Sequence, residues 1–550
     1  QQFRQKAPNI LLQMLLRGAN AVGYTSYPDN VVKEFIRLAA KNGVDVFRIF
    51  DSLNGLDNMR LSIDTVRECN KVAEAALCYT GDILDPRRDK YDLNYYVEMA
   101  KELAAAGANI VAIKDMAGLL KPEAAYRLVS ALKDAVDLPI HLHTHEGSGN
   151  AIYTYARAVD AGVDIVDTAM SAMSCGTSQP SGSSLSYALS GHPRQPRVDV
   201  DAMNELSRYW ETVRPYYKAA DQTELFPNPE VYVHEMPGGQ YTNLKQQATA
   251  LGLIERWEEV KDMYHRVSMM FGDLIKVTPS SKIVGDMALF MVQNDLSEED
   301  IYAKGDVLDF PASVVEFFEG RIGVPYQGFP QKLQQIVLKG RKPLEGRPGD
   351  TLPPVDFDEV KAKLAELEAP VSEEAVSSYC LYPKVFTDWV KRVQDFGDVS
   401  VLDTPTFFFG MKIGEEIKVE IEQGKMLVIK LVHIGEANAD GIRTVSFEFN
   451  GLPREIDIKD RNVKATNISR KKADKANQGE IGATLSGSVV KVMVEKGQAV
   501  TKGTPLVVTE AMKMETTIAA PISGIVAQIH VAAGNRIESG DCLLEIELKA

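Results

Sequence analysis

Three histidines occupy alternate positions of one short strand-like segment. His141, His143 and His145 lie in "HLHTH", in a chain with 8 histidines in all. Residues at i, i+2 and i+4 of a strand point to the same face. Imidazole is a common ligand of divalent cations, so this spacing predicts a metal site. The alternative is a structural histidine cluster, and two inward-facing ligands fit a metal site better than three.

A lysine at the end of another strand belongs with these histidines. "AIKDMAGL" places Lys114 at the C-terminal end of a predicted strand, the end at which active sites form in (β/α)₈ barrels. A buried lysine beside a cation should lose its proton, because desolvation and the cation both disfavour the ammonium. A neutral lysine can add CO₂ and form a carbamate, which is an oxygen ligand.

A second lysine stands in an unusually regular frame near the C-terminus. In "VVTEAMKMETT", Lys513 lies between two methionines, and the segments on either side repeat at a constant offset of 37. The offset matches Gly497 with Gly534 and Gly503 with Gly540. Two copies with a glycine at each turn predict a small two-fold β-sandwich. Lys513 should then occupy the exposed tip of the hairpin that joins the halves.

The elements that must position Lys114 and the histidines alternate between strand and helix. The predicted strands are 10–16, 45–50, 74–79, 109–114, 139–145 and 164–169. Strands alternating with helices predict βαβ units and a parallel sheet. The predicted class is therefore α/β, a TIM-type (β/α)₈ barrel without its first two strands. An open doubly wound sheet is the alternative, but no Gly-rich phosphate loop follows any strand.

The remainder of the chain changes character several times. We predict a barrel over 1–200, a helical region over 201–375, a mixed α+β domain over 376–465, a linker over 466–480 and an all-β sandwich over 481–550. The Pro- and Gly-rich stretch 342–359 indicates a boundary. Residues 461–480 carry six basic and two acidic residues and almost nothing apolar, which is typical of a flexible tether.

Composition excludes several classes of protein. A net charge of -15 argues against a nucleic-acid partner, and no apolar run reaches the roughly 18 residues that a membrane span needs. The 5 cysteines form no CxxC pair, which favours a reducing compartment, and we expect the cytoplasm of a bacterium. The first residues form no signal peptide, and the missing initiator Met suggests a piece of a longer protein.

The C-terminal repeat closely resembles a known family. "EAMKME" between two glycine-bearing halves, over residues 480–550, is similar to the biotinyl carrier domain of biotin-dependent carboxylases. Lipoyl domains share this fold but flank their lysine with other residues. The resemblance implies that a biotin protein ligase attaches biotin to Lys513 through an amide. A tethered arm raises the effective concentration of biotin at a partner site.

The other motifs extend the resemblance over essentially the whole chain. The segments are "LLRGANAVGYTSYPDN", "VFRIFDSLN", "CYTGDILDP", "IKDMAGLLKP", "HLHTH", "HEMPGGQYTNL" and "VTPSSKIVGDMA". Together they resemble the carboxyltransferase domain of the pyruvate carboxylase family, a group of ligases. The resemblance implies carboxyl transfer from carboxybiotin to pyruvate, giving oxaloacetate for gluconeogenesis and anaplerosis. It also implies a homotetramer, acetyl-CoA as an allosteric activator, and an ATP-dependent biotin carboxylase domain outside this chain.

The resemblance assigns three ligands of a metal site, and the fourth ligand of the family has no counterpart in this chain. Lys114, as its carbamate, would bind manganese or zinc with His143 and His145, and His141 would be the non-ligand histidine. The fourth ligand of the family is an aspartate on the first barrel strand, which this chain does not contain. The family also reads HTHDTSGN where this chain has "HTHEGSGN", so metal affinity or loop shape can differ here.

The resemblance also assigns the substrate site. Arg17 would clamp the pyruvate carboxylate with its planar guanidinium, and Tyr24 would line the pocket between pyruvate and biotin. Thr278 would shuttle the proton, although a Thr before Pro is more often turn chemistry. The predicted biotin contacts are Gln240, Ser281 and Lys282.

Two rival functions remain open at this point. A related biotin-dependent decarboxylase or transcarboxylase subunit would share the barrel and the carrier, but the strand-rich region before the carrier argues against it. A biotin-carrying scaffold without catalysis is the other rival. Metal analysis separates an enzyme from a scaffold, and avidin blotting with mass spectrometry tests Lys513.

Overall fold

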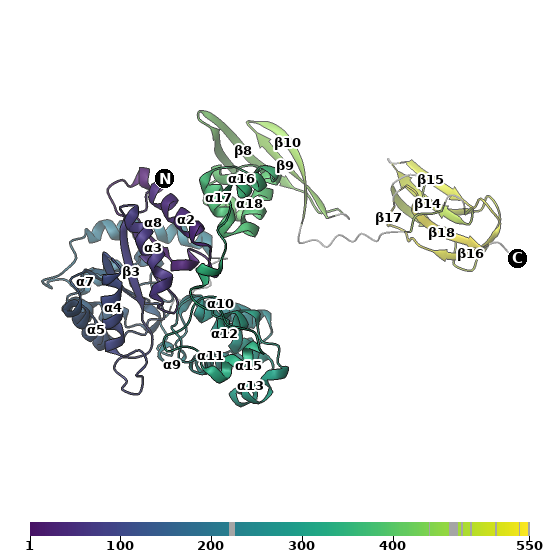
Figure 1. The fold of residues 1–550 in the computed structure, drawn as a ribbon. Coiled ribbons are helices and arrows are strands. Elements are labelled where there is room, and N and C mark those ends of the chain that lie inside the picture. The colour runs from purple at the N-terminus through teal and green to yellow at the C-terminus, as the bar shows by residue number, and fades with distance from the viewer. Residues whose placement is uncertain are drawn as a thin grey trace. The chain divides into compact units, whose positions relative to one another are not determined.

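The computed structural model describes most of the chain, in two compact units. The described residues are 1–218, 226–438, 441–460, 471–474, 477–484, 487–511, 514–537 and 539–547. The first unit is Gln1–Ser400 and the second is Val401–Ala550 (Figure 1). We describe each unit by itself.

The first unit begins with a parallel sheet whose strands run in chain order. Its elements are α1 (Gln2–Lys6), β1 (Gln13–Leu16), α2 (Asp29–Lys41), β2 (Val46–Ile49), α3 (Leu56–Glu68), β3 (Val72–Cys78), α4 (Leu93–Ala105), β4 (Ile110–Asp115), α5 (Pro122–Ala135), β5 (Ile140–Thr144), α6 (Ala151–Asp160), β6 (Ile165–Val166) and α7 (Gly182–Ala188). The sheet is 6-stranded in the order β1-β2-β3-β4-β5-β6, and each described pair is parallel. This half-barrel confirms the predicted α/β class.

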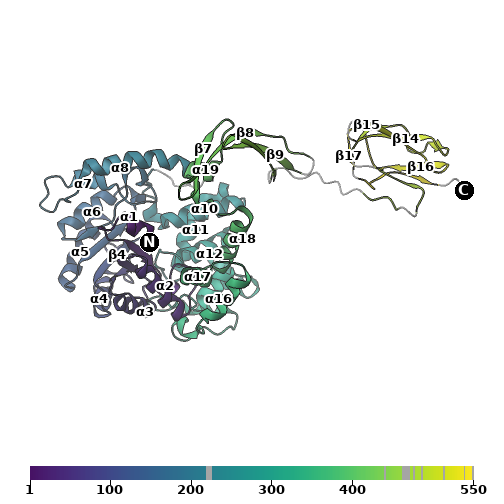
Figure 2. The same ribbon diagram turned by 90° about the horizontal axis from the view of Figure 1, so that it is seen from above.

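Burial explains why these segments form a covered parallel sheet. Strand β2 is buried at every position and β3 at all but its first, as expected for strands with helices on their outer side. Helices α3 to α6 pack against β2 to β5 and against one another (Figures 1 and 2). Gly43, Gly107 and Gly162 follow the ends of α2, α4 and α6 and have φ of 108°, 96° and 97°, which a residue with a Cβ rarely adopts. These glycines therefore turn the chain from helix to strand.

The helical region follows the sheet within the same unit. Its helices are α8 (Val200–Val213), α9 (Val231–His234), α10 (Gly238–Ala250), α11 (Trp257–Met270), α12 (Ser280–Gln293), α13 (Glu298–Lys304), α14 (Ala312–Phe318), α15 (Gln331–Leu338), α16 (Phe357–Glu366), α17 (Glu373–Leu381) and α18 (Pro383–Phe396). Most of the buried apolar side chains of α10 to α15 form one core, which contains Phe271, Phe317 and Phe318. A smaller core joins α16, α17 and α18.

The stretch predicted as a boundary is bound to the sheet-bearing part. Arg347 forms an ion pair with Asp29 at 2.7 Å, and Asn30 donates a hydrogen bond of 2.8 Å to the carbonyl of Val355. Helix α17 also packs against α2, and the Tyr27 hydroxyl donates to the carbonyl of Leu381 at 2.7 Å. Residues 342–359 therefore do not separate two independent bodies, and the predicted domain limits stay a prediction.

The second unit begins with a short helix and an antiparallel sheet. Helix α19 (Thr404–Phe409) is followed by β7 (Glu416–Glu422), β8 (Lys425–Ile434), β9 (Ile442–Phe449) and β10 (Leu452–Lys459). The four strands form a meander in the order β10-β9-β8-β7. Within the predicted mixed α+β domain, the first strand thus starts at Glu416, and α17 and α18 occupy most of residues 376–396.

The C-terminal region is a sandwich of two 4-stranded sheets. Its strands are β11 (Glu480–Gly482), β12 (Gly487–Val492), β13 (Ala499–Val500), β14 (Pro505–Ala511), β15 (Met514–Ala519), β16 (Gly524–Ile529), β17 (Arg536–Ile537) and β18 (Cys542–Glu547). One sheet has the order β11-β18-β16-β13 and the other β15-β14-β12-β17.

The predicted repeat is present in these strands. At the offset of 37 seen in the sequence, β12 matches β16, β13 matches β17 and β14 matches β18. The matched glycines have nearly equal φ, 88° and 83° for Gly497 and Gly534, and 92° and 88° for Gly503 and Gly540. The hairpin pairs Ala511 with Met514, and Lys513 itself lies outside the described residues.

Part of the predicted tether is folded onto the sandwich. Lys472 forms an isolated bridge with Asp541, and the carbonyl of Lys471 accepts a hydrogen bond of 2.8 Å from the backbone of Cys542. The Lys471 ammonium lies 2.7 Å from Glu480 and 2.8 Å from Glu545. Lys471, one of the basic residues that suggested a solvated linker, thus has two carboxylate partners. Residues 461–470 lie outside the described part.

Two further expectations concern membranes and cysteines. Among the described residues, no helix is long and apolar enough to cross a membrane. All five cysteines, Cys69, Cys78, Cys175, Cys380 and Cys542, are free thiols. No disulfide therefore joins the described residues.

Matched core substitutions test the two-fold repeat. Leu506 and Leu543 occupy equivalent positions, and both are fully buried in the sandwich core. We expect Leu506→Ala and Leu543→Ala each to destabilise the sandwich by about 2–5 kcal/mol, because each leaves a cavity. Hydrogen exchange of the β12 and β16 amides in the full chain measures this loss. Val490→Ala, at a half-exposed position, serves as the control. Unchanged hydrogen exchange in either leucine variant would contradict the equivalence of the two core positions.

Candidate active site at the carboxyl ends of the strands

The strand register brings Lys114 and His143 side by side. In the ladder between β4 and β5, Lys114 is the partner of His143 and Ala112 is the partner of His141. Paired residues of parallel neighbours project to the same face, so the lysine and the histidines share one side of the sheet. His145 follows directly after β5. The residues predicted as metal ligands therefore meet at one end of the sheet.

His143 and His145 point their unprotonated nitrogens at each other. His143 Nδ1 lies 2.7 Å from Asp167 Oδ2, and His145 Nδ1 lies 2.6 Å from the carbonyl oxygen of Thr177. These oxygens only accept hydrogen bonds, and the Asp167 oxygen lies closer to His143 Nδ1 than the Arg48 donor does at 3.3 Å. We therefore assign the proton of each neutral ring to Nδ1 and a lone pair to Nε2. The two Nε2 atoms are 3.1 Å apart. Two lone pairs at this distance repel, and a cation between them would relieve the repulsion.

Burial keeps both rings neutral. Burial lowers the pKa of His143 to about 4, against the opposing hydrogen bond to Asp167. Burial, with the neighbouring ring of His143, lowers the pKa of His145 to about 3. At neutral pH both imidazoles are therefore unprotonated and able to bind a metal.

Asp167 holds the histidines together with Arg48. Its two oxygens accept from His141 Nε2 at 2.9 Å and from His143 Nδ1, and it forms an ion pair with the buried Arg48. Arg48 also pairs with Glu74, whose carboxylate accepts from His141 Nδ1 at 2.9 Å. Burial alone would raise the pKa of Asp167, but these hydrogen bonds and the guanidinium hold it well below its usual range. Both nitrogens of His141 are thus occupied, which supports its assignment as a non-ligand.

Lys114 lies in surroundings that favour its neutral form. Its amine contacts Met116 Sδ and lies 4.7 Å from the centre of the Phe50 ring, and no ion pair to a carboxylate is seen for it among the described residues. Burial lowers the pKa of Lys114 to about 8, and the charges of Arg48 and Arg17 act in the same direction. A substantial fraction is therefore deprotonated near neutral pH and can react with CO₂.

Arg17 begins the turn that follows β1. One of its terminal nitrogens donates to the carbonyls of Val22 and Gly23 at 3.1 and 3.0 Å, and its guanidinium lies 5.0 Å from the Tyr24 ring centre. Its Nε is buried and has no hydrogen-bond partner among the described residues. A buried donor without a partner is costly, so this atom is suited to a ligand carboxylate.

The helical region contributes the predicted proton shuttle and biotin contacts. Thr278 precedes α12, and its hydroxyl lies 3.3 Å from that of Ser281. Lys282 Nζ pairs with Asp286 at 2.6 Å. Gln240 is buried at the start of α10, and its Nε2 has no hydrogen-bond partner within the part of the chain that the structure describes. The amide nitrogen of Gln240 is thus a second orphaned donor among the predicted ligand contacts.

A cleft of about 460 Å³ joins some of these residues. Its lining includes Tyr24 from the sheet-bearing part, Pro279 just before α12, and Lys282 within α12. Ser280 connects the same two parts, since its hydroxyl lies 3.4 Å from the carbonyl oxygen of Ser52. The structure thus places Tyr24 and Lys282, far apart in sequence, on one cleft.

Several residues of the site were not predicted from the sequence. Arg48 and Glu74 are charged residues within strands that are otherwise apolar, which is a signal that could have singled them out. Asp167 lies within the predicted strand 164–169 and directly follows β6 in the structure. A second buried network joins Arg88 and Lys276 to Glu235 and Asp273, and this network anchors the segment before Thr278 to the loop after β3. Its members come from distant segments with no common motif.

Three protein families match the chain. The family described as HMGL-like matches residues 31–209, a conserved carboxylase domain matches 231–430, and the family described as biotin-requiring enzyme matches 475–546. The fold and the matches define an α/β half-barrel and helical region joined to a biotin-requiring domain.

Individual relatives are more specific. Pyruvate carboxylase of Bacillus subtilis is 58% identical over 546 residues, which are 99% of this chain and 48% of that protein. The carboxyl transferase domain of Rhizobium etli pyruvate carboxylase, solved with pyruvate and biocytin, is 53% identical with a TM-score of 0.81, over 83% of this chain and 77% of that one. The complete Rhizobium etli enzyme has a TM-score of 0.81 at 50% identity, over 98% of this chain and 50% of that one.

The chain belongs to the pyruvate carboxylase family. It spans about half the length of the curated relatives that it matches. The match to the biotin-requiring family indicates biotin as a cofactor.

Removing the Asp167 carboxylate tests the orientation of the histidines. We expect Asp167→Asn to weaken binding of Mn²⁺ or Zn²⁺ by about 10–100-fold, because His143 loses the charged acceptor that fixes its tautomer. Competition with a chromogenic chelator measures the affinity, and circular dichroism checks folding. Asp160→Asn, at a half-exposed carboxylate away from the histidines, is the control. Unchanged affinity in Asp167→Asn would contradict the positioning role.

The depressed pKa of Lys114 predicts a pH-dependent reaction with CO₂. Only the neutral amine adds CO₂, so carbamate should be scarce at pH 6 and increase as the pH rises through about 8. Carbon-13 NMR of the chelator-treated chain under labelled bicarbonate detects the signal. Lys114→Gln should abolish it, whereas Lys121→Gln should not. A signal that is independent of pH, or that survives Lys114→Gln, would refute the prediction.

Proposed function

We propose that this chain is the carboxyltransferase part of a biotin-dependent pyruvate carboxylase. It moves a carboxyl group from biotin on Lys513 to pyruvate and forms oxaloacetate. The observation that carries the proposal is the pair of neutral Nε2 atoms 3.1 Å apart beside the buried Lys114, in a chain with a biotin-requiring domain. The related domain solved with pyruvate and biocytin supports this choice of substrate and cofactor.

His143, His145 and Lys114, as its carbamate, would hold a divalent cation such as Mn²⁺ or Zn²⁺. When bound, the cation supplies Lewis-acid polarisation of the substrate oxygen. The residues fit such a group, because both rings are neutral with their protons fixed on Nδ1. The carboxylate of Asp167 and the carbonyl of Thr177 orient the rings by accepting hydrogen bonds from the two Nδ1 atoms.

Arg17 would bind the carboxylate of pyruvate. Its orphaned Nε and its planar guanidinium offer donors that a carboxylate can accept in pairs. Tyr24 lies against the guanidinium and lines the cleft, so it would separate the pyruvate and biotin positions.

Thr278 would move the proton. Carboxybiotin would release CO₂ by cleavage of the bond between its carboxyl group and the ureido nitrogen. The Thr278 hydroxyl would pass its proton to that nitrogen and receive the proton of the pyruvate methyl group, and the resulting enolate would attack the released CO₂ to form oxaloacetate. Ser281, whose hydroxyl lies 3.3 Å from that of Thr278, would orient the Thr278 hydroxyl. Ser281, Gln240 and Lys282 would contact the incoming biotin. Exclusion of water from the site would protect the enolate from protonation.

The longer relatives suggest the remaining parts of the assembly. We propose an ATP-dependent biotin carboxylase part outside this chain, a biotin protein ligase that modifies Lys513, and a homotetramer in the bacterial cytoplasm. Acetyl-CoA would act as an allosteric activator. The limits 1–200, 201–375, 376–465, 466–480 and 481–550 remain our proposal for the barrel, helical, allosteric, linker and carrier segments.

The reverse half reaction tests this function in the chain itself. With added biotin, the chain should decarboxylate oxaloacetate to pyruvate, which lactate dehydrogenase detects. We expect Thr278→Ala to lower the rate by at least ~100-fold, in line with loss of a general acid–base group, whereas Thr278→Ser keeps the hydroxyl and most of the rate. An inactive wild-type chain with metal and biotin would refute the proposed function. A fully active Thr278→Ala would refute the role of Thr278 in proton transfer.

A further inference from the structure

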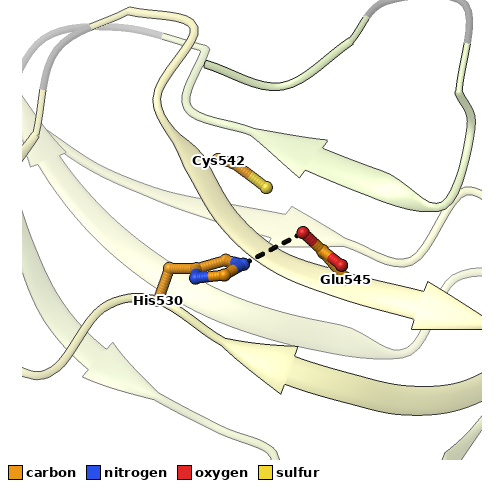
Figure 3. Close-up of side chains that lie close together, drawn as sticks. All are labelled: His530, Cys542 and Glu545. Carbon is orange, nitrogen blue, oxygen red and sulfur yellow. Dashed lines mark hydrogen bonds and ion pairs between the residues drawn. The ribbon is translucent and has the colours of Figure 1, made fainter. Parts of the chain in front are cut away.

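A second group of metal-binding side chains lies in the C-terminal sandwich. His530 directly follows β16, and Cys542 and Glu545 belong to the neighbouring strand β18 (Figure 3). One nitrogen, sulfur or oxygen atom of each residue lies within 4.8 Å of those of the other two. His530 Nε2 is 3.1 Å from Glu545 Oε1. None of these residues takes part in the function proposed above.

A bulge in β18 brings the three side chains to one face. Glu545 pairs with Glu480 of β11 and Cys542 pairs with Gly482, so the two residues face partners that are two positions apart. Cys542 and Glu545 would point to opposite faces of a regular strand, because they are three positions apart. The extra residue, Leu543, lies in the core together with Leu544. Cys542 is therefore displaced to the same side as Glu545.

His530 reaches this face from the adjacent strand. Gln528 pairs with Glu545, and His530 is two positions further along, so both share the side of Glu545. The backbone of His530 donates to the carbonyl of Leu543 at 2.8 Å, which holds it beside the bulge. In Figure 3 the imidazole and the carboxylate approach each other and the thiol points toward them.

The two-fold repeat provides an internal comparison. The offset of 37 matches His530 with Met493, Cys542 with Pro505 and Glu545 with Val508. The equivalent positions of the first half thus lack this combination of imidazole, thiol and carboxylate. The cluster is consequently a feature of one half, and the sandwich fold does not require it.

The chemistry of the three donors selects the cation. Thiolate, imidazole and carboxylate together suit Zn²⁺, and three protein ligands leave a fourth position for water. A tetrahedral zinc with bonds of about 2.0–2.3 Å separates its donors by roughly 3.3–3.8 Å, so side-chain shifts of about 1 Å would close the site. We propose that His530, Cys542 and Glu545 bind a divalent cation of the zinc class.

Binding of the cation would displace the thiol proton of Cys542, and the cation would share the carboxylate of Glu545 with Lys471. Cys542 is fully buried, and burial with the nearby carboxylates raises the pKa of its thiol to about 11, so the cation must release that proton to solvent. Lys471 and His530 both contact Oε1 of Glu545, and neither uses Oε2. Lys471 also pairs with Glu480 at 2.7 Å, which would retain its ammonium when the cation takes Glu545.

The site would fasten the segment before the sandwich. The backbone of Cys542 donates to the carbonyl of Lys471, so a cation on the Cys542 side chain would restrain both β18 and residues 471–474. A structural role of this kind predicts protection of β18 from hydrogen exchange when Zn²⁺ is added.

Cobalt substitution tests the site in the full chain. After chelator treatment under a phosphine reductant, Co²⁺ should produce a thiolate-to-cobalt absorption band in the near ultraviolet. The band should be absent in Cys542→Ser and in His530→Gln and present in Cys69→Ser and Met493→Ala. The proposed ligands in the parallel sheet include no thiolate, so the band separates the two sites.

Zinc binding supplies a second readout. The wild-type chain should bind one more equivalent of Zn²⁺ than His530→Gln, or bind it at least ~10-fold more tightly, and Zn²⁺ should protect β18 only in the wild type. His530→Gln changes a partly exposed side chain, so its exchange pattern without metal should equal that of the wild type. A wild type without the thiolate band, a band that persists in Cys542→Ser, or equal zinc binding by His530→Gln would each overturn the proposal.

Discussion

The candidate active site depends on the single carboxylate of Asp167. It accepts from His141 and His143 and pairs with the buried Arg48, so one partly buried carboxylate orients two rings and pairs with a guanidinium inside the sheet. Without it, His143 would be free to place its proton on either nitrogen, and Arg48 would be a partly unpaired buried charge. The lone pair directed at His145 follows from this arrangement.

The neutrality of the site has a common physical origin. Burial lowers the pKa of Lys114, His143 and His145, and the neighbouring cations Arg17 and Arg48 further disfavour an ammonium on Lys114. Neutral nitrogen is the form that binds a cation or reacts with CO₂. The same surroundings favour an anionic ligand at Arg17, whose Nε has no partner in the described segments; in our proposal this ligand is the carboxylate of pyruvate. The site thus concentrates donors for an anion beside ligands for a metal.

The two sheets of the sandwich show how a repeat can acquire an additional feature. Leu506 and Leu543 fill equivalent core positions, and the matched glycines turn the chain with nearly equal φ. One bulge in β18 nevertheless gives the second half a thiol beside an imidazole and a carboxylate, where the first half has Pro505, Met493 and Val508. The core leucines therefore preserve the two-fold symmetry, whereas the side chains at 530, 542 and 545 differ from their equivalents.

Local patterns in the sequence determined much of this protein. Alternating helices and strands predicted the order of the parallel sheet, the spacing of His141, His143 and His145 predicted their common face, and the 37-residue offset predicted the sandwich. These signals are local, because side-chain periodicity follows from backbone geometry. The partners of Asp167, the network around Lys276, the cleft between Tyr24 and Lys282 and the folded residues 471–474 were decided only by tertiary structure. Each depends on segments that are distant in sequence, and no local pattern specifies which buried charges will meet.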